Sequence, residues 1–317
     1  MNQSETTTYP FGTVPRRLTN FIPESDAGII GREAELADTY HRLHSGKPAV
    51  LVNGIGGMGK TTIAAKYIVR YFHDYRHFAW LTVQGSLTET FYNNAALLDA
   101  LHLRDEVREL VEAKQTGAAF ELVFKKLNDL EKTLVVVDNA NDLADLVEMK
   151  KHFDRAHCHF LLTSRTTPQA WQIVEVKPLP DADAIALFRS HCPAADADDA
   201  TIGALLKTLE GHTLLVELVA KSAAASGIGV AELQGILREK FIHDAALNKR
   251  SVETGTNGDS LSDLRKRAKV EEYIWLIFKN IAEVPPTAQE LLRTFALLPP
   301  ATAFNEGVID RDERDQQ

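Results

Sequence analysis

The sequence predicts an α/β fold in which a parallel β-sheet, covered by helices on both faces, precedes an appended helical domain. Short apolar runs rich in valine and leucine alternate with helix-like segments as far as Pro178, which is typical of a buried parallel sheet. After Pro178 the strand-like runs stop, and helical periodicity continues over 181–226 and 229–240.

The expected strands and helices follow from the length and composition of each run. We expect short, polar-bounded strands at 48–53, 77–84, 134–137, 160–163 and 172–176. We expect helices from Gly31 onward, over 61–73, as two segments within 88–130, and over 181–191, 198–209, 213–226 and 229–240.

Changes in composition along the chain predict its organisation. The first 25 residues are rich in Thr, Pro and Ser, which is typical of an extended or disordered segment. The expected parts are a flexible N-terminal segment (1–25), a sheet domain (26–178), a small helical domain (179–245), a polar linker (246–268), two further helical segments (269–300) and a polar tail (301–317).

Composition excludes several classes of protein. The chain of 317 residues has a net charge of −9, which disfavours nucleic acid as a general partner. The two cysteines lack the paired spacing of a disulfide framework or a zinc site. No apolar run reaches the roughly 18 residues of a membrane span, and the N-terminus has no apolar signal core. We therefore expect no membrane partner and a cytoplasmic location.

A phosphate-binding loop lies between the first long predicted strand and its following helix. The segment Gly54–Thr62 (GIGGMGKTT) fits the P-loop pattern G-x-x-x-x-G-K-[ST]. Glycines let backbone N–H groups turn toward phosphate oxygens, and the helix N-terminus adds positive potential. We expect nucleotide contacts from Gly54, Gly56, Gly57, Met58, Gly59, Lys60, Thr61 and Thr62. The fold class is thus a three-layer P-loop NTPase with a helical lid.

The ends of two later strands supply further candidates. Asp138 follows the apolar run 134–137 in the Walker B pattern, where a carboxylate meets a Mg²⁺ ion that Thr61 also binds. Arg165 ends the next strand, from which a forked guanidinium can reach a γ-phosphate. The predicted catalytic residues are Lys60, Asp138 and Arg165, and the predicted metal ligands are Thr61 and Asp138.

The residue after Asp138 predicts slow turnover. Many ATPases of this kind carry a second acid there, but Asn139 has an amide, which cannot accept a proton from water. Asp142 is a nearby carboxylate that fits either a catalytic role or a helix cap. We expect a weak ATPase that holds nucleotide more than it turns nucleotide over.

The order of the motifs resembles a known family. The segments Gly31–Glu33, Gly54–Ala64, Leu134–Asn141, Phe160–Arg165 and Gly211–Leu218 resemble the NB-ARC module of STAND-type signal-transduction ATPases. The resemblance implies that ATP or ADP is the nucleotide and that Ile30, Arg32 and Leu214 also contact it. It further implies a nucleotide-dependent switch whose partner is a second copy of the chain or a separate effector or sensor protein.

The chain departs from the family pattern at two further points. Thr213 stands where a proline usually contacts the nucleotide. The region 269–300, ending in FALLP, resembles only the start of a winged-helix domain, and we expect no effector domain before residue 26. We expect a fragment, or missing parts supplied by another chain, and rapid ADP exchange as a result.

Two alternative functions remain at this point. A P-loop kinase acting on a small molecule would need several arginines in a mobile lid, whereas the segment 181–226 contains a single arginine, Arg189. An ATP-dependent DNA-binding regulator would need a complete winged helix, and the acidic charge balance weakens that alternative.

Overall fold

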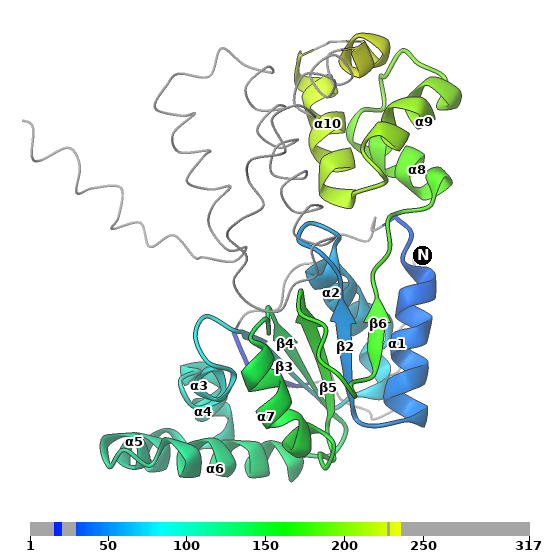
Figure 1. Cartoon of the computed structure of the whole chain (residues 1–317). Coiled ribbons are helices and arrows are strands. Elements are labelled where there is room, and N and C mark those ends of the chain that lie inside the picture. The colour runs from blue at the N-terminus through cyan, green and yellow to red at the C-terminus, as the bar shows by residue number, and fades with distance from the viewer. Residues whose placement is uncertain (1–15, 21–29, 227–228, 236–317) are drawn as a thin grey trace, which may run out of the picture.

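The computed structural model describes residues 16–20, 30–226 and 229–235. Within these ranges a parallel sheet lies beneath a separate group of helices (Figure 1). The predicted linker 246–268, the segments 269–300 and 301–317, and the end of the 179–245 domain lie outside the described residues.

All paired strands of the sheet run parallel, in the order β1-β3-β4-β5-β2-β6. This order places β5 between β4 and β2, so the two predicted phosphate-site strands flank the strand that Arg165 directly follows. The strand bounds are β1 (Arg16–Arg17), β2 (Ala49–Asn53), β3 (His77–Thr82), β4 (Thr133–Asp138), β5 (His159–Ser164) and β6 (Ile173–Glu175).

Helices cover both faces of the sheet and form the unit beyond it. They are α1 (Glu33–Ser45), α2 (Lys60–Arg70), the 3-10 helix η1 (Phe72–Asp74), α3 (Leu87–Tyr92), α4 (Ala95–Leu101), α5 (Arg104–Glu112), α6 (Thr116–Asn128), α7 (Leu143–Phe153), α8 (Asp181–His191), α9 (Asp199–Thr208) and α10 (Thr213–Ser226). Residues 230–235 are also helical.

The alternation of side chains along each strand produces two separate cores. In β4, Leu134 and Val136 pack with α1 and α2, whereas Val135 and Val137 pack with the group α3–α7. All four side chains are fully buried, which explains the unbroken apolar run that predicted a buried strand. The three-layer α/β fold is therefore confirmed.

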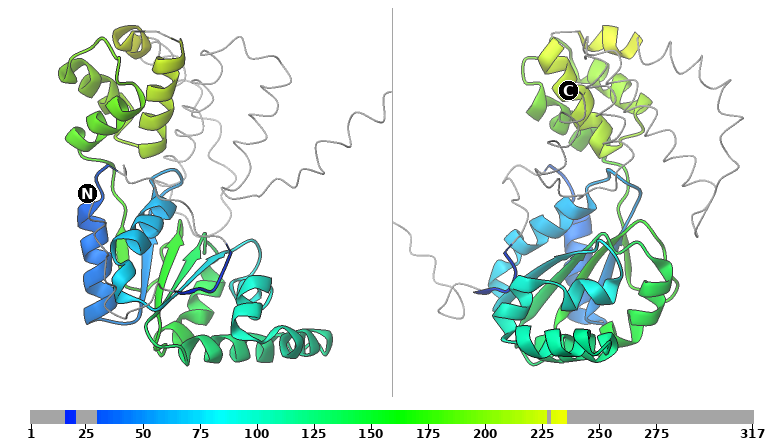
Figure 2. Two further views of the ribbon diagram at one scale, coloured as in Figure 1. Left: turned by 180° about the vertical axis from the view of Figure 1, so that it is seen from behind. Right: turned by 90° about the vertical axis from the view of Figure 1, so that its left-hand side faces the viewer.

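The appended helices form a third core of their own. Leu179, Phe188, Leu205 and Val216 are buried in a cluster made by α8, α9 and α10. This group, the lid (residues 179–226), lies beyond the carboxyl ends of the strands, as the two further views also show (Figure 2). Within the described residues, no helix combines the length and apolar character that crossing a membrane requires.

Two sequence-based expectations about secondary structure were incomplete. Arg16–Arg17 adds an edge strand to β3, and the adjacent Leu18 and Thr19 are buried, so this part of the 1–25 segment is ordered. The region 88–130 forms four short helices rather than two. Ser86 and Asn94 cap two of them by accepting from backbone N–H groups, which supports short helices that periodicity alone blurs together.

Candidate nucleotide-binding site

The P-loop connects β2 to α2 and curls around one lysine. Gly57 and Gly59 have φ values of 75° and 89°, a left-handed conformation that favours glycine. The Lys60 Nζ donates to the carbonyl oxygens of Gly54 and Ile55 at 2.7 and 2.8 Å. The ammonium group therefore lies inside the loop, where phosphate oxygens could replace these carbonyl contacts.

Thr61 and Asp138 lie together although 77 positions separate them. The Thr61 Oγ1 donates to Asp138 Oδ1 at 3.0 Å, and Asp138 is only 4% exposed. Thr163 also donates to the same carboxylate oxygen at 2.5 Å. A hydroxyl and a carboxylate at the mouth of a P-loop are suitable oxygen ligands for Mg²⁺, so the residues present fit that ion.

Arg165 lies over the P-loop. Its Cζ is 3.5 Å from the place that a β-carbon on Gly56 would take. Because β5 separates β4 from β2, a side chain at the end of β5 can reach the loop that follows β2. The predicted catalytic group of Lys60, Asp138 and Arg165 thus gathers at one edge of the sheet.

Further hydrogen bonds brace the same edge, and two of the side chains that make them, Asn53 and Thr163, were not selected from the sequence. The buried Asn53 donates to the carbonyl of Thr166 at 2.7 Å, and the Asn139 backbone N–H donates to Thr163 Oγ1 at 2.9 Å. Asn139 has a φ of 68°, and its side chain donates to the carbonyl of Val83 beyond β3. The sequence marks Asn53 and Thr163 only as polar residues at strand ends, and this signal is weak because polar residues are common there.

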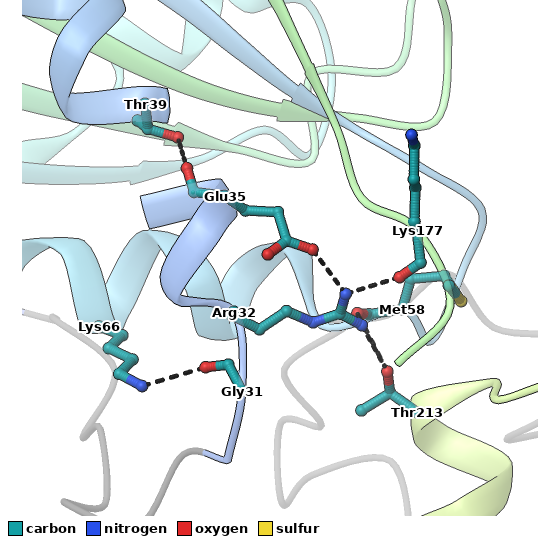
Figure 3. Close-up of polar contacts among 8 residues, drawn as sticks. All are labelled: Gly31, Arg32, Glu35, Thr39, Met58, Lys66, Lys177 and Thr213. Atoms are coloured by element: carbon teal, nitrogen blue, oxygen red, sulfur yellow. Dashed lines mark hydrogen bonds and ion pairs between the residues drawn. The ribbon is translucent and has the colours of Figure 1, made fainter. Parts of the chain in front are cut away.

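Arg32 joins three parts of the molecule (Figure 3). Its guanidinium donates to Glu35 at 2.8 Å, to the Lys177 carbonyl at 2.6 Å, to the Met58 carbonyl at 3.0 Å and to Thr213 Oγ1 at 2.8 Å. Its side chain is only 4% exposed. These bonds connect the start of α1, the P-loop and the lid, which is a structural role beyond the nucleotide contact that the family resemblance implied.

The lid binds directly to the P-loop. The Nε2 of His212 lies 2.8 Å from the Gly56 carbonyl, Leu214 N–H donates to the Gly57 carbonyl at 3.0 Å, and Thr213 Oγ1 donates to the Met58 carbonyl at 3.3 Å. These contacts, here called the lid latch (residues 212–214), use three successive P-loop carbonyls. A proline at position 213 would have no hydroxyl for either Met58 or Arg32, so both of these bonds depend on the threonine.

His212 is buried at the centre of the latch. The Leu215 N–H donates to its Nδ1 at 3.4 Å, so Nε2 carries the proton that is donated to Gly56. Burial lowers the pKa of His212, and the nearby positive charge of Lys60 lowers it further. The neutral ring is therefore the form that fits the latch at neutral pH.

The remaining predicted residues have separate positions. Thr62 is exposed on the first turn of α2, and Ile30 begins the segment that leads to Arg32. Asp142 caps α7 by accepting from Asp145 N–H at 2.9 Å, which favours the helix-cap interpretation. Arg189 bonds Asp199 and the Ala197 carbonyl within the lid, an arrangement that offers no support for a kinase lid arginine.

The chain is similar in sequence to proteins from plants and mycobacteria. The chain is 27% identical over 250 residues to the probable disease resistance protein RF45 of Arabidopsis thaliana, covering 74% of this chain and 24% of that protein. It is 26% identical over 240 residues to an uncharacterized protein of Mycobacterium tuberculosis, covering 71% and 56% respectively. The chain thus spans about a quarter of the length of the first relative and about half of the second.

Among solved structures, a Walker-type ATPase of Pyrococcus abyssi matches with a TM-score of 0.45 and 16% identity, covering 87% of this chain and 91% of that one. The family model for the NB-ARC domain matches residues 32–191, which include the P-loop, Asp138 and Arg165. This match spans half of the 317-residue sequence. The chain therefore belongs to the NB-ARC family of nucleotide-binding P-loop ATPase modules.

Proposed function

We propose that this chain is an ATP- and ADP-binding switch in which the P-loop and the lid change together, controlling self-association in signalling or defence. The observation that carries the proposal is the lid latch, because residues 212–214 bond three successive carbonyls of the phosphate-binding loop. A ligand that alters this loop must therefore alter the surface on which the lid rests.

The strength of the latch suits a switch. A hydrogen bond within a protein contributes about 0.5–1.5 kcal/mol, so three such bonds amount to roughly 2–4 kcal/mol. Moving a two-state equilibrium from one side to the other takes about 5.5 kcal/mol of differential binding. The latch is thus strong enough to favour the closed state and weak enough for nucleotide exchange to oppose it.

The residues of the site have distinct roles in this proposal. Lys60 and the P-loop backbone hold the phosphates, and Arg165 contacts the γ-phosphate, which distinguishes ATP from ADP. Thr61 and Asp138 hold Mg²⁺, which neutralises charge on the phosphate oxygens when bound. Ile30, Arg32 and Leu214 border the base side, and the proposed domains are 26–178 and 179–245.

Slow hydrolysis is part of the proposal. The side chain of Asn139 is an amide, which cannot accept a proton from water as a carboxylate would. Its contact with the Val83 carbonyl also holds it toward β3, which lies on the opposite side of β4 from the P-loop strand β2. We expect single-turnover hydrolysis far slower than that of fast ATPases. An Asp142→Ala variant should bind and hydrolyse ATP as the natural chain does, because that carboxylate caps α7.

The link to defence rests on similarity alone. Relatives from Arabidopsis thaliana are named probable disease resistance proteins, and this chain aligns with about a quarter of their length. A second copy of the chain, or a separate effector or sensor protein, is the partner that such a switch would require.

The decisive experiment measures nucleotide and mass together. The nucleotide retained on purification is identified, and the solution mass is then measured with ADP, with a non-hydrolysable ATP analogue, and with neither. We expect adenine nucleotide to bind and the ATP analogue to increase the mass. Equal masses in all three states would contradict the switch, and phosphate transfer to a small-molecule acceptor would favour a kinase.

A further inference from the structure

Asn141 links the strand ends on either side of the predicted γ-phosphate contact. It lies in the loop between β4 and α7, two residues beyond Asn139. Its Oδ1 accepts the Arg165 backbone N–H at 2.8 Å, and its Nδ2 donates to Asn139 Oδ1 at 2.5 Å. Its carbonyl accepts from Thr166 Oγ1 at 2.6 Å. One half-buried amide thus holds the loops that follow two strands.

Arg165 depends on this support because the sheet ends just before it. The pairing of β5 with β2 stops at Ser164, and the pairing with β4 stops at Leu162. The Arg165 N–H is therefore the first beyond the ladder, and Asn141 supplies its acceptor. The backbone held in this way carries the guanidinium that lies over Gly56.

We propose that Asn141 is a positioning residue that sets the preference of the site for ATP over ADP by holding the backbone of Arg165 in place. This inference rests on the proposed function, in which Arg165 contacts the γ-phosphate. Without the acceptor on Asn141, the backbone at Arg165 gains freedom, and the forked contact with the γ-phosphate weakens because it depends on orientation. Contacts with the α- and β-phosphates, which come from the P-loop, should change little.

The amide is suited to this position because it donates and accepts at the same time. Asn141→Asp keeps an acceptor for the Arg165 N–H but loses the donor to Asn139. Asn141→Ala and Asn141→Leu lose both, and leucine keeps a similar side-chain size. The acceptor and the donor can therefore be tested separately.

Asn128 offers a matched control at the other end of β5. Its Oδ1 accepts the backbone N–H of His157 at 2.9 Å, just as Asn141 accepts that of Arg165. It lies at the amino end of the strand, far from the P-loop. Asn128→Ala therefore removes a comparable bond, together with two longer contacts from Cys158, without touching the site.

The test measures dissociation constants for ADP and for a non-hydrolysable ATP analogue in the full chain. Arg165→Ala should weaken the analogue about tenfold or more while leaving ADP nearly unchanged. Asn141→Ala and Asn141→Leu should weaken the analogue selectively by about three- to tenfold, with little further loss when combined with Arg165→Ala. Asn141→Asp should keep most of the preference, and Asn128→Ala all of it.

Different failures have different meanings. An equal loss of affinity for ADP and for the ATP analogue in Arg165→Ala would overturn the γ-phosphate role and this inference with it. Selective loss in Arg165→Ala without selective loss in either Asn141→Ala or Asn141→Leu would overturn the positioning role alone. So would full additivity of the two changes, or an Asn141→Asp variant as impaired as Asn141→Ala.

Discussion

Hydrogen-bonded polar side chains are buried at both ends of the parallel sheet, but only one end has the features of a binding site. At the carboxyl end, Thr61, Asp138 and Thr163 converge beside the P-loop. At the amino end, the Tyr75 hydroxyl bonds His159 Nδ1 at 2.8 Å and lies 3.3 Å from the Tyr67 hydroxyl. Both sets are well connected, yet only the first borders a loop able to hold an anion.

The difference lies in backbone geometry and in charge. The carboxyl end combines a glycine-rich loop in left-handed conformations with a helix N-terminus and a cationic side chain. The amino end is surrounded by aromatic rings, and burial raises the pKa of Tyr75 and lowers that of His159 to about 4. Burial also lowers the pKa of His212 beside the P-loop, so a perturbed pKa marks burial at either end of the sheet, whereas loop geometry marks the candidate site.

The largest expected effect distinguishes lysines at the two ends. Lys60→Ala should weaken ADP and ATP binding by about a hundredfold, because it removes a charged donor from the phosphate loop. Lys47→Ala removes an exposed amine that pairs with Asp154, and it should leave affinity unchanged. Titration calorimetry measures the nucleotide affinity of both variants. Equal affinities would contradict the expectation that only the carboxyl end of the sheet binds nucleotide.

A glycine pair tests whether the lid and the P-loop are coupled. A β-carbon on Gly57, at φ 75°, would lie 2.6 Å from His212 Cε1, so Gly57→Ala should cost roughly 2 kcal/mol of stability and weaken nucleotide binding. Gly117→Ala meets nothing within 4 Å and should leave stability the same or slightly higher. Thermal unfolding with and without ADP measures the contrast. Nucleotide affinity unaffected by Gly57→Ala would argue against the coupling.

Acid should act on the amino end through His159. Its pKa of about 4 lies below the ordinary value of 6.5, so the unfolded chain binds more protons between these values. Stability should therefore fall as pH drops from about 6.5 to 4, by roughly 3 kcal/mol from this group. His159→Gln should flatten this part of a urea-unfolding profile measured against pH. An unchanged slope would assign the acid sensitivity elsewhere.

The smallest expected effect comes from removing one hydroxyl at the amino end. Tyr75→Phe loses the bonds to His159 and Tyr67 and should cost about 1 kcal/mol in urea unfolding. Nucleotide affinity should stay the same, because the change lies at the end of the sheet away from the P-loop. A marked loss of ADP binding would show that the two ends are not independent.

Much of this architecture could be read from local patterns. Apolar runs predicted β2 to β6, and glycine spacing predicted the P-loop, because strand burial and loop curvature depend on neighbouring residues. The edge strand at Arg16–Arg17 was not predicted, because two polar residues give no apolar pattern. Its position depends on pairing with β3. The four helices within 88–130 were predicted as two, because hydrophobic periodicity alone does not reveal single capping residues such as Ser86 and Asn94.

The family and the phosphate loop could be predicted because each motif consists of residues close together in the chain, and the motifs follow one another in a characteristic order. The junctions that give the site its character do not: Asn141 meets Arg165 across 24 positions, His212 meets Gly56 across 156, and Arg32 meets Thr213 across 181. Each bond joins a common polar side chain to a distant backbone or side-chain group, and it forms only after the sheet and lid have packed. Periodicity and motif spacing record local preference, whereas these contacts depend on the folded arrangement of distant segments.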